Sequence, residues 1–298
     1  MNIEIKHVTA INNPELQIFS GLSESQLSHY LEPEPGLFIA ESPMIIRRAY
    51  AAGYQPVCML AEERLLHPSP ESFLGACGIP AAAVADVPEL ISSTGEILPE
   101  VVNRVSPKGF LDNLPEEDQS KNNEPIPGYA ESLPVYAAPL SALISITGYQ
   151  LTRGVLCAMR RKKLPDLSEV LRKTRRIVLL ENVMNPTNLG AIFRSAAALG
   201  IDGVLLTKGC TDPYYRRSAR VSMGTVFQIP WTYVENGPAG IELLHRQGFS
   251  AAAMTLSPDS IHLQDLRTSD YERLALIMGT EGPGLTEETV RLCDLSVT

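Results

Sequence analysis

Short apolar runs bounded by turn residues recur along this chain, and in its second half they alternate with amphipathic segments. Runs of this length and composition are typical of buried strands. Because strands that alternate with helices build parallel sheets covered on both faces, the pattern predicts an α/β fold. The predicted strands lie at 36–41, 56–63, 133–139, 153–160, 177–183, 203–207, 249–256 and 274–279.

Amphipathic segments between those strands predict helices. Residues 42–53 have Ser42 at the cap position, a proline at the first helical position and Gly53 as the stop. In the segment 189–199, apolar side chains recur at spacings of three and four, and Asn188 precedes them as the expected cap. Two further helices are expected at 237–248 and 284–294.

Composition divides the chain into two predicted domains. An N-terminal α/β domain is expected over 1–163, with a proline-rich, polar and loop-rich insertion at about 86–134. Residues 164–175 are expected to be a linker, and 176–298 a C-terminal domain built on the parallel sheet. Ligands of such sheets bind at the carboxyl ends of the strands, so the loops that follow the strands are the candidate sites.

Charge and cysteine usage narrow the class of protein. The 298 residues carry a net charge of −9 with a pI near 5.2, which argues against a protein that coats nucleic acid. Basic residues nevertheless gather at 159–163, 172–176 and 214–220, and clusters around one candidate site favour a polyanionic partner. Five scattered cysteines predict reduced thiols and no metal site. No apolar run is long enough for a membrane span and the start lacks a signal-peptide layout, so a cytoplasmic protein without a membrane partner is expected.

The stretch NPTNLGAIFRSAAALG, at 185–200, places a single arginine on an otherwise small and apolar helix. Arg194 is expected to lean over Gly190 toward the strand ends, because helical side chains point toward the helix N-terminus. The helix dipole would add a second positive feature there, which suits a phosphate or carboxylate. On this helix alone, a surface arginine paired with a neighbouring acid is the better explanation.

A second loop, GTEGPGLTEE at 279–288, also follows a predicted strand and opens a helix. Its glycines permit close backbone approach and unusual torsions, and Thr286 is the expected cap. Glu281 stands at the carboxyl end of the strand, where a parallel sheet could bring it near Asn188 and Arg194. Neither loop has the spacing of a dinucleotide fingerprint or a P-loop, which disfavours a nicotinamide or ATP enzyme.

Together, ENVMNPTNLGAIFRSAAALG and IMGTEGPGL resemble the first two signature motifs of the SpoU/TrmH family of RNA ribose 2′-O-methyltransferases. The connecting DPYYRRSARVSMGTVFQIPW also resembles that family, so the resemblance is strong over about 176–298. It is weaker for GLFIAESPMIIRRAYAAGYQP, which is similar to the small RNA-binding domain that often precedes the catalytic one. The resemblance implies a knotted α/β methyltransferase domain, a homodimer, RNA as the partner and S-adenosylmethionine as the cofactor.

The resemblance also implies site residues. The implied catalytic residues are Asn188, Arg194 and Glu281. The implied cofactor-binding residues are Thr255, Leu256, Gly279, Thr280 and Gly282. The basic clusters supply the expected RNA-binding residues, which are Arg160, Arg161, Arg216, Arg217 and Arg220.

The implied reaction moves a methyl group from S-adenosylmethionine to a ribose 2′-hydroxyl of structured RNA, with rRNA favoured over tRNA. The chain stops at LCDLSVT, where the third motif of the family would begin. The chain as given is therefore expected to bind the cofactor poorly and to be inactive. A non-catalytic RNA-binding protein on the same fold is one alternative. An α/β enzyme acting on a small anion, favoured by the acidic pI, is the other.

Overall fold

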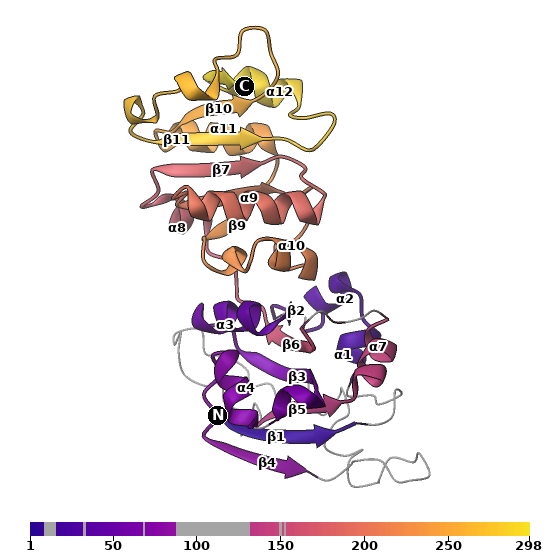
Figure 1. The fold of residues 1–298 in the computed structure, drawn as a ribbon. Helices are drawn as coiled ribbons and strands as arrows, with labels where there is room; N and C mark the ends of the chain where they lie inside the picture. Colours follow the sequence, from indigo (N-terminus) through magenta and orange to yellow (C-terminus); the bar gives the residue numbers. More distant parts are fainter. Residues whose placement is uncertain (9–15, 32–33, 68, 88–131, 149–150, 152) are drawn as a thin grey trace. The chain divides into compact units, whose positions relative to one another are not determined.

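The structure is a computed structural model that describes residues 1–8, 16–31, 34–67, 69–87, 132–148, 151 and 153–298 (Figure 1). Contacts divide the chain into unit 1, Met1–Lys162, and unit 2, Lys163–Thr298. The insertion expected at 86–134 lies almost entirely outside the described residues. In the described part of the chain, no helix combines the length and apolar character needed to cross a membrane.

Unit 1 contains a mixed six-stranded sheet with the order β2-β6-β3-β5-β1-β4. Strand β6 runs antiparallel to both neighbours, and the other pairs are parallel. The strands are β1 (Asn2–His7), β2 (Leu37–Glu41), β3 (Pro56–Glu62), β4 (Ala83–Val87), β5 (Ser132–Ala138) and β6 (Val155–Arg160). The helices are α1 (Gln17–Ser20), α2 (Glu24–Ser28), α3 (Pro43–Ala51), α4 (Pro70–Ala76) and α7 (Leu140–Thr147), with a 3-10 turn η2 (Glu63–Leu66).

Helix α3 shows how closely local sequence sets the elements of unit 1. Pro43 starts the helix and Gly53 follows its end with a φ of 83°, as the sequence predicts. Ser42 occupies the cap position, but its side chain makes no capping hydrogen bond and its φ is 90°. The predicted cap position is therefore confirmed, but the side chain does not cap the helix, because the backbone at this residue departs from the usual conformation of a capping serine.

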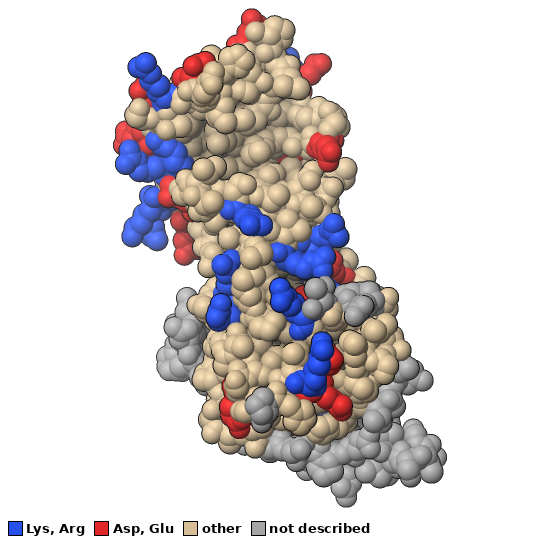
Figure 2. Space-filling view, in the orientation of Figure 1, with Lys and Arg blue, Asp and Glu red and all other residues tan. Residues whose placement is uncertain are grey.

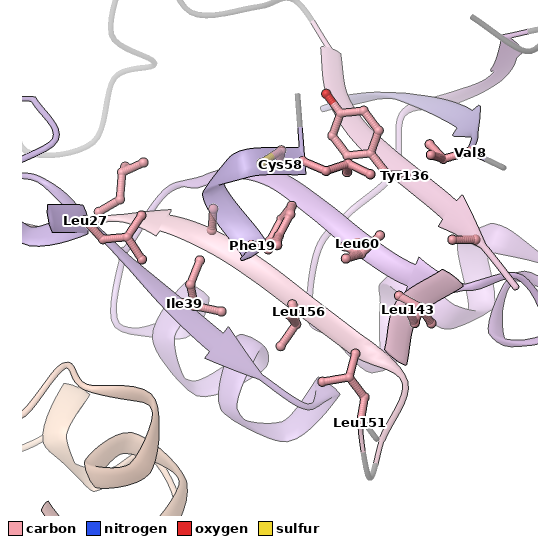
Figure 3. Packing of buried hydrophobic residues seen from close by; sticks show 14 of the residues in the cluster. Val8, Phe19, Leu27, Ile39, Cys58, Leu60, Tyr136, Leu143, Leu151 and Leu156 are labelled. Atoms are coloured by element: carbon pink, nitrogen blue, oxygen red, sulfur yellow. The ribbon is translucent and has the colours of Figure 1, made fainter. Parts of the chain in front are cut away.

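One face of the unit 1 sheet packs against α1, α2 and α7 through a single apolar cluster. Phe19 and Leu143 come from helices, whereas Ile39, Leu60 and Leu156 come from three neighbouring strands (Figure 3). All five are at most 6% exposed. Burial on this scale stabilises the unit mainly through the hydrophobic effect.

Unit 2 contains a second six-stranded sheet, in which every pair of neighbouring strands is parallel. Its order is β12-β10-β11-β7-β8-β9. This confirms the parallel sheet predicted from the alternating pattern. The strands are β7 (Arg176–Leu180), β8 (Gly203–Thr207), β9 (Trp231–Val234), β10 (Ser250–Met254), β11 (Leu274–Met278) and β12 (Leu295–Val297).

Helices cover both faces of this sheet. Helix α11 packs on the face that carries Leu179, because its Gly240 lies directly over that side chain. Helix α9 lies on the opposite face (Figure 1). The helices are α8 (Leu167–Leu171), α9 (Pro186–Ala198), α10 (Arg216–Val221), α11 (Gly237–Arg246) and α12 (Glu287–Leu292), with a 3-10 turn η3 (Thr225–Phe227).

The segment between the two sheets differs from the sequence-based expectation. A linker is expected over 164–175, whereas α8 within that range packs into the core of unit 2. Val170 and Leu171 are each 2% exposed and belong to the cluster that contains Ile177 and Leu244. The apolar spacing of this short helix therefore reflects burial in unit 2.

Candidate active site

The loops at one edge of the unit 2 sheet converge because of the order of its strands. The chain passes from β7 to β8 and β9 in one direction, and the later strands β10, β11 and β12 lie on the other side of β7. Strand β11 is the direct neighbour of β7. In open parallel sheets, ligands bind outside the carboxyl ends of the strands at the point where the strand order reverses. That point lies between β7 and β11.

Helix α9 begins one turn earlier than the sequence predicts. Its first residue is Pro186, and the side chain of Asn185 caps it by accepting from the backbone N–H of Thr187 at 2.9 Å. The prediction of Asn188 as the cap is therefore wrong. Proline suits the first helical position because its φ is fixed and it has no N–H to satisfy. Asn188 instead lies in the first turn, where its side chain can reach another segment.

The side chain of Asn188 joins the two candidate loops. Its Nδ2 donates to Oε2 of Glu281 over 3.0 Å, across a separation of 93 residues. The expected approach of Glu281 to Asn188 is therefore present. Within the described residues, Glu281 makes no hydrogen bond or ion pair with Arg194. The structure thus brings together two of the three implied catalytic side chains by direct contact.

The loop between β11 and α12 folds back on itself. Gly282 and Gly284 have φ values of 92° and 72°, which glycine tolerates far better than other residues. A Cβ added to Gly279 would lie 2.3 Å from the carbonyl carbon of Gly284. The backbone N–H of Gly284 donates to the carbonyl of Thr280 at 3.1 Å. The loop therefore requires small residues, and it places Thr280 and Glu281 at the carboxyl edge.

Arg194 is exposed on α9, and within the described residues it makes no hydrogen bond or ion pair. Gly190, over which Arg194 is expected to lean, offers no open space. Gly190 is buried because α10 packs against it, and a Cβ there would lie 2.7 Å from the carbonyl oxygen of Ser218. The glycine thus serves a close helix–helix contact. Arg194 lies four residues beyond it, so the two share one side of α9.

The expected RNA-binding arginines separate into two groups. In unit 2, Arg217 is exposed and its Nε donates to the hydroxyl of Thr187 at 2.9 Å, beside Asn188. Arg216 is half-buried and Arg220 is exposed on the same helix. In unit 1, Arg160 ends β6, and the Nε of Arg161 donates to the carbonyl of Leu37 at 3.0 Å.

Thr255 and Leu256 follow β10, which is the other neighbour of β11. The backbone of Thr255 donates to Val297 at 2.9 Å and accepts from the hydroxyl of Ser260 at 3.1 Å, so the loop is anchored. Leu256 is 94% exposed. An apolar side chain this exposed at a carboxyl strand end is a feature that ligand sites often use.

Glu181, which directly follows β7, is missed by the sequence analysis. It is 3% exposed, and its carboxylate accepts from the backbone N–H of Thr286 at 2.9 Å and from the hydroxyl of Thr289 at 2.7 Å. The carboxylate therefore fixes the start of α12 to the end of β7. The sequence did contain a signal for this contact. A charged residue ends an apolar strand, and two threonines stand at the start of a distant helix.

Cys210 ties the loops after β7 and β8 together. Its thiol donates to the carbonyl of Leu180 at 3.2 Å and accepts from the N–H of Val183 at 3.3 Å. Burial raises the pKa of the Cys210 thiol, while hydrogen bonds with Val183, Thr207 and Asn182 lower it to a smaller extent. A thiol held in its neutral form is a poor nucleophile. Cys210 therefore supports the loops structurally.

The C-terminal part of the chain is similar to a known family. Residues 175–298 match the SpoU rRNA methylase family. An uncharacterised tRNA/rRNA methyltransferase of Mycobacterium bovis is 39% identical over 165 residues, which are 55% of this chain and 57% of the relative. The 23S rRNA (guanosine(2553)-2′-O)-methyltransferase RlmP of Bacillus subtilis is 31% identical over 43% of this chain and 50% of its own length. The chain thus spans little more than half the length of such curated relatives.

Solved structures extend the likeness to the fold of the whole chain. An rRNA methyltransferase from Sinorhizobium meliloti has a TM-score of 0.65 at 20% identity, covering 99% of this chain and 89% of its own. The SpoU methyltransferase AviRb from Streptomyces viridochromogenes, in complex with its cofactor AdoMet, has a TM-score of 0.61 at 15% identity, covering 96% and 88%. At these identities the likeness establishes the fold alone.

Proposed function

We propose that this chain transfers a methyl group from S-adenosylmethionine to a ribose 2′-hydroxyl of RNA, because residues 175–298 match the SpoU rRNA methylase family. One observation carries the proposal. The hydrogen bond between Asn188 and Glu281 holds the two motif loops together at the point where the strand order reverses, and Asn188 shares helix α9 with the exposed Arg194. That is where the implied reaction needs its polar groups.

The cofactor would bind along the carboxyl ends of β10 and β11. S-adenosylmethionine supplies a methyl group on a sulfonium. The residues present suit it, because Leu256 offers an exposed apolar surface and the tight loop at 279–284 offers backbone groups. Space around Gly282 supports the fit, since a Cβ added there meets no atom within 4 Å. Thr255, Gly279 and Thr280 complete the proposed set.

Arg194 would orient the acceptor nucleotide through a phosphate and stabilise the alkoxide that develops on the ribose. An in-line displacement depends on positioning, so an arginine that holds the acceptor supplies much of the acceleration. A guanidinium has no proton-accepting form near neutral pH, and we therefore assign no general base to it. Asn188 and Glu281 would keep the two loops in register around the reacting groups.

RNA is the proposed substrate, with rRNA favoured over tRNA. The description of the matching family and the name of the Bacillus subtilis relative support rRNA. The arginines of α10 support a polyanion, because phosphate contacts depend on such side chains. The family resemblance further supports a homodimer and a knot in unit 2. Light scattering tests the dimer, which would have twice the mass of one chain.

The central experiment incubates the chain with methyl-labelled S-adenosylmethionine and purified bacterial rRNA or tRNA. Digestion to nucleosides and mass spectrometry then locate the label. Because the chain as given is expected to be inactive, the same incubation is also run with a C-terminal segment of the family type added, and there we expect label on the ribose of an rRNA nucleoside. Label on a base would overturn the assignment of the 2′-hydroxyl as the methyl acceptor. Label in tRNA alone would show that tRNA, and not rRNA, is the substrate. No incorporation, with S-adenosylmethionine binding intact in calorimetry, would argue against catalysis by this chain.

A further inference from the structure

Two helices of unit 2 meet along a line that carries unpaired positive charge. We call it the α9–α10 seam and define it by Thr187, Gly190 and Arg194 on α9 and Arg217 on α10. Thr187, Gly190 and Arg194 lie on one side of α9, because they are three and four residues apart. Figure 2 shows basic side chains gathered where Figure 1 places α10.

The seam is closely packed. The hypothetical Cβ of Gly190 would approach the carbonyl oxygen of Ser218 to 2.7 Å and the Cβ of Val221 to 2.9 Å. Backbone therefore meets backbone, with no side chain from α9 between them. A contact of this kind fixes α10 on α9 and so fixes where the side chains of α10 emerge.

Arg217 is then oriented by one hydrogen bond. Its Nε donates to the hydroxyl of Thr187 at 2.9 Å, and within the described residues this is its one hydrogen bond or ion pair. The guanidinium has five N–H donors in a rigid fork. Using Nε on Thr187 leaves the Nη atoms for an external acceptor. That acceptor would lie near the first turn of α9, next to Asn188.

The electrostatics of the seam favour an anion. The sequences of α9 and α10 contain no aspartate or glutamate, although the chain carries a net charge of −9. Some exposed cations elsewhere in the described residues pair with acids, as Lys208 does with Glu235 and Arg64 with Glu62. Arg194 and Arg217 have no such partner there. Two arginines without counter-ions on adjoining helices keep their full field for a ligand.

We propose that the α9–α10 seam binds the phosphodiester backbone of the RNA acceptor, with Arg217 as a phosphate contact and Thr187 as its positioning residue. The inference rests on the proposed function, since it assigns a subsite to the same substrate. A guanidinium fork suits phosphate oxygens, and phosphate contacts fix the position of a nucleic acid without reading its sequence. The seam would thus hold the strand beside the acceptor nucleotide, whatever its bases.

The test measures binding of a fluorescein-labelled RNA hairpin by fluorescence anisotropy over a series of salt concentrations. Arg217→Gln is expected to weaken binding about 3- to 10-fold and to reduce the slope of log affinity against log salt by about one, because one phosphate contact is lost. Thr187→Val retains the charge, so it should weaken binding about 2- to 5-fold with an unchanged slope. In the double variant the two effects should not add, because Thr187 acts through Arg217.

Arg246→Gln is the matched control, because Arg246 is an exposed arginine near the end of α11, on the other face of the sheet. It should leave affinity and slope unchanged. If Arg217→Gln behaves like this control, or if the effects of Thr187→Val and Arg217→Gln simply add, the seam proposal fails. Failure of the proposed function looks different. It would appear as wild-type RNA binding with the full salt slope but no methyl transfer.

Discussion

Arginines at the two edges of the unit 2 sheet differ in how many of their donors the protein itself satisfies. At the amino edge, Arg273 donates to the carbonyls of Leu171, Thr174 and Gln247 and lies 4.2 Å from the ring centre of Phe249. Arg176 at the same edge likewise donates to several carbonyls between 268 and 272. On α9, which begins at the carboxyl edge, Arg194 has no hydrogen-bond or ion-pair partner among the described residues, and Arg217 on the adjoining α10 has one.

The difference separates arginines that hold the fold from arginines that remain available to a ligand. The two kinds cannot be told apart in the sequence, since Arg176 and Arg217 each belong to a basic cluster. A guanidinium whose donors are satisfied by backbone carbonyls has little left for a phosphate, whereas an exposed and unpaired one does. Substitutions at the two edges should therefore have opposite consequences for stability and for activity.

Arg194→Ala should give the largest effect, and it should fall on activity. We expect methyl transfer to RNA to decrease about 100-fold or more, as when a donor to a developing oxyanion is removed. The free energy of unfolding should change by less than about 0.5 kcal/mol, because the residue is exposed and unpaired. Initial rates and urea unfolding measure the two quantities, with a C-terminal segment of the family type added to both variant and parent. Retained activity would remove Arg194 from the site and abolish the contrast between the edges.

Arg273→Ala should give the reverse pattern. Three carbonyls lose a charged donor and the ring of Phe249 loses its cation, so the free energy of unfolding should fall by about 2 kcal/mol. The rate of methyl transfer per folded molecule should stay within a factor of about two of the parent rate. Arg273→Lys should recover little of the stability, because an ammonium cannot reproduce the fork. If Arg273→Ala and the parent had the same urea midpoint, water would replace these hydrogen bonds without loss of stability.

Gly190→Ala sharpens the comparison at the carboxyl edge itself, with a smaller effect. The added methyl meets the backbone of α10, so we expect a loss of about 1 to 2 kcal/mol in stability and a weaker affinity for RNA as Arg217 moves. Gly75→Ala is the matched control, because a Cβ there has open space within α4. It should be neutral or stabilising by up to about 1 kcal/mol. Equal behaviour of the two variants would contradict the close packing of the seam.

Local sequence predicts the elements of unit 2 better than their arrangement. Apolar runs mark β7, β8, β10 and β11, and Thr286 caps α12 as expected, because these features depend on neighbours in the chain. The contact between Asn188 and Glu281 follows once β11 is placed beside β7, which short-range pattern alone cannot decide. Glu181 escapes prediction because its partners are more than a hundred residues away. The role of Gly190 cannot be predicted from local sequence, because its packing partner α10 is a short helix whose sequence is recognisable mainly by its arginines.

The neighbouring positions of β7 and β11 have a consequence for how the protein matures during synthesis. Asn188 and Glu281 are 93 residues apart, so at the usual speed of translation the second follows the first after roughly 5 to 20 seconds. Throughout that interval the growing chain holds one half of the site without the other. The hydrogen bond between Glu181 and Thr289 forms later after its first residue is made, because these two residues are 108 positions apart. A ribosome-bound intermediate that ends before β11 therefore has no paired motif loops, and their pairing becomes one of the last steps in the formation of unit 2.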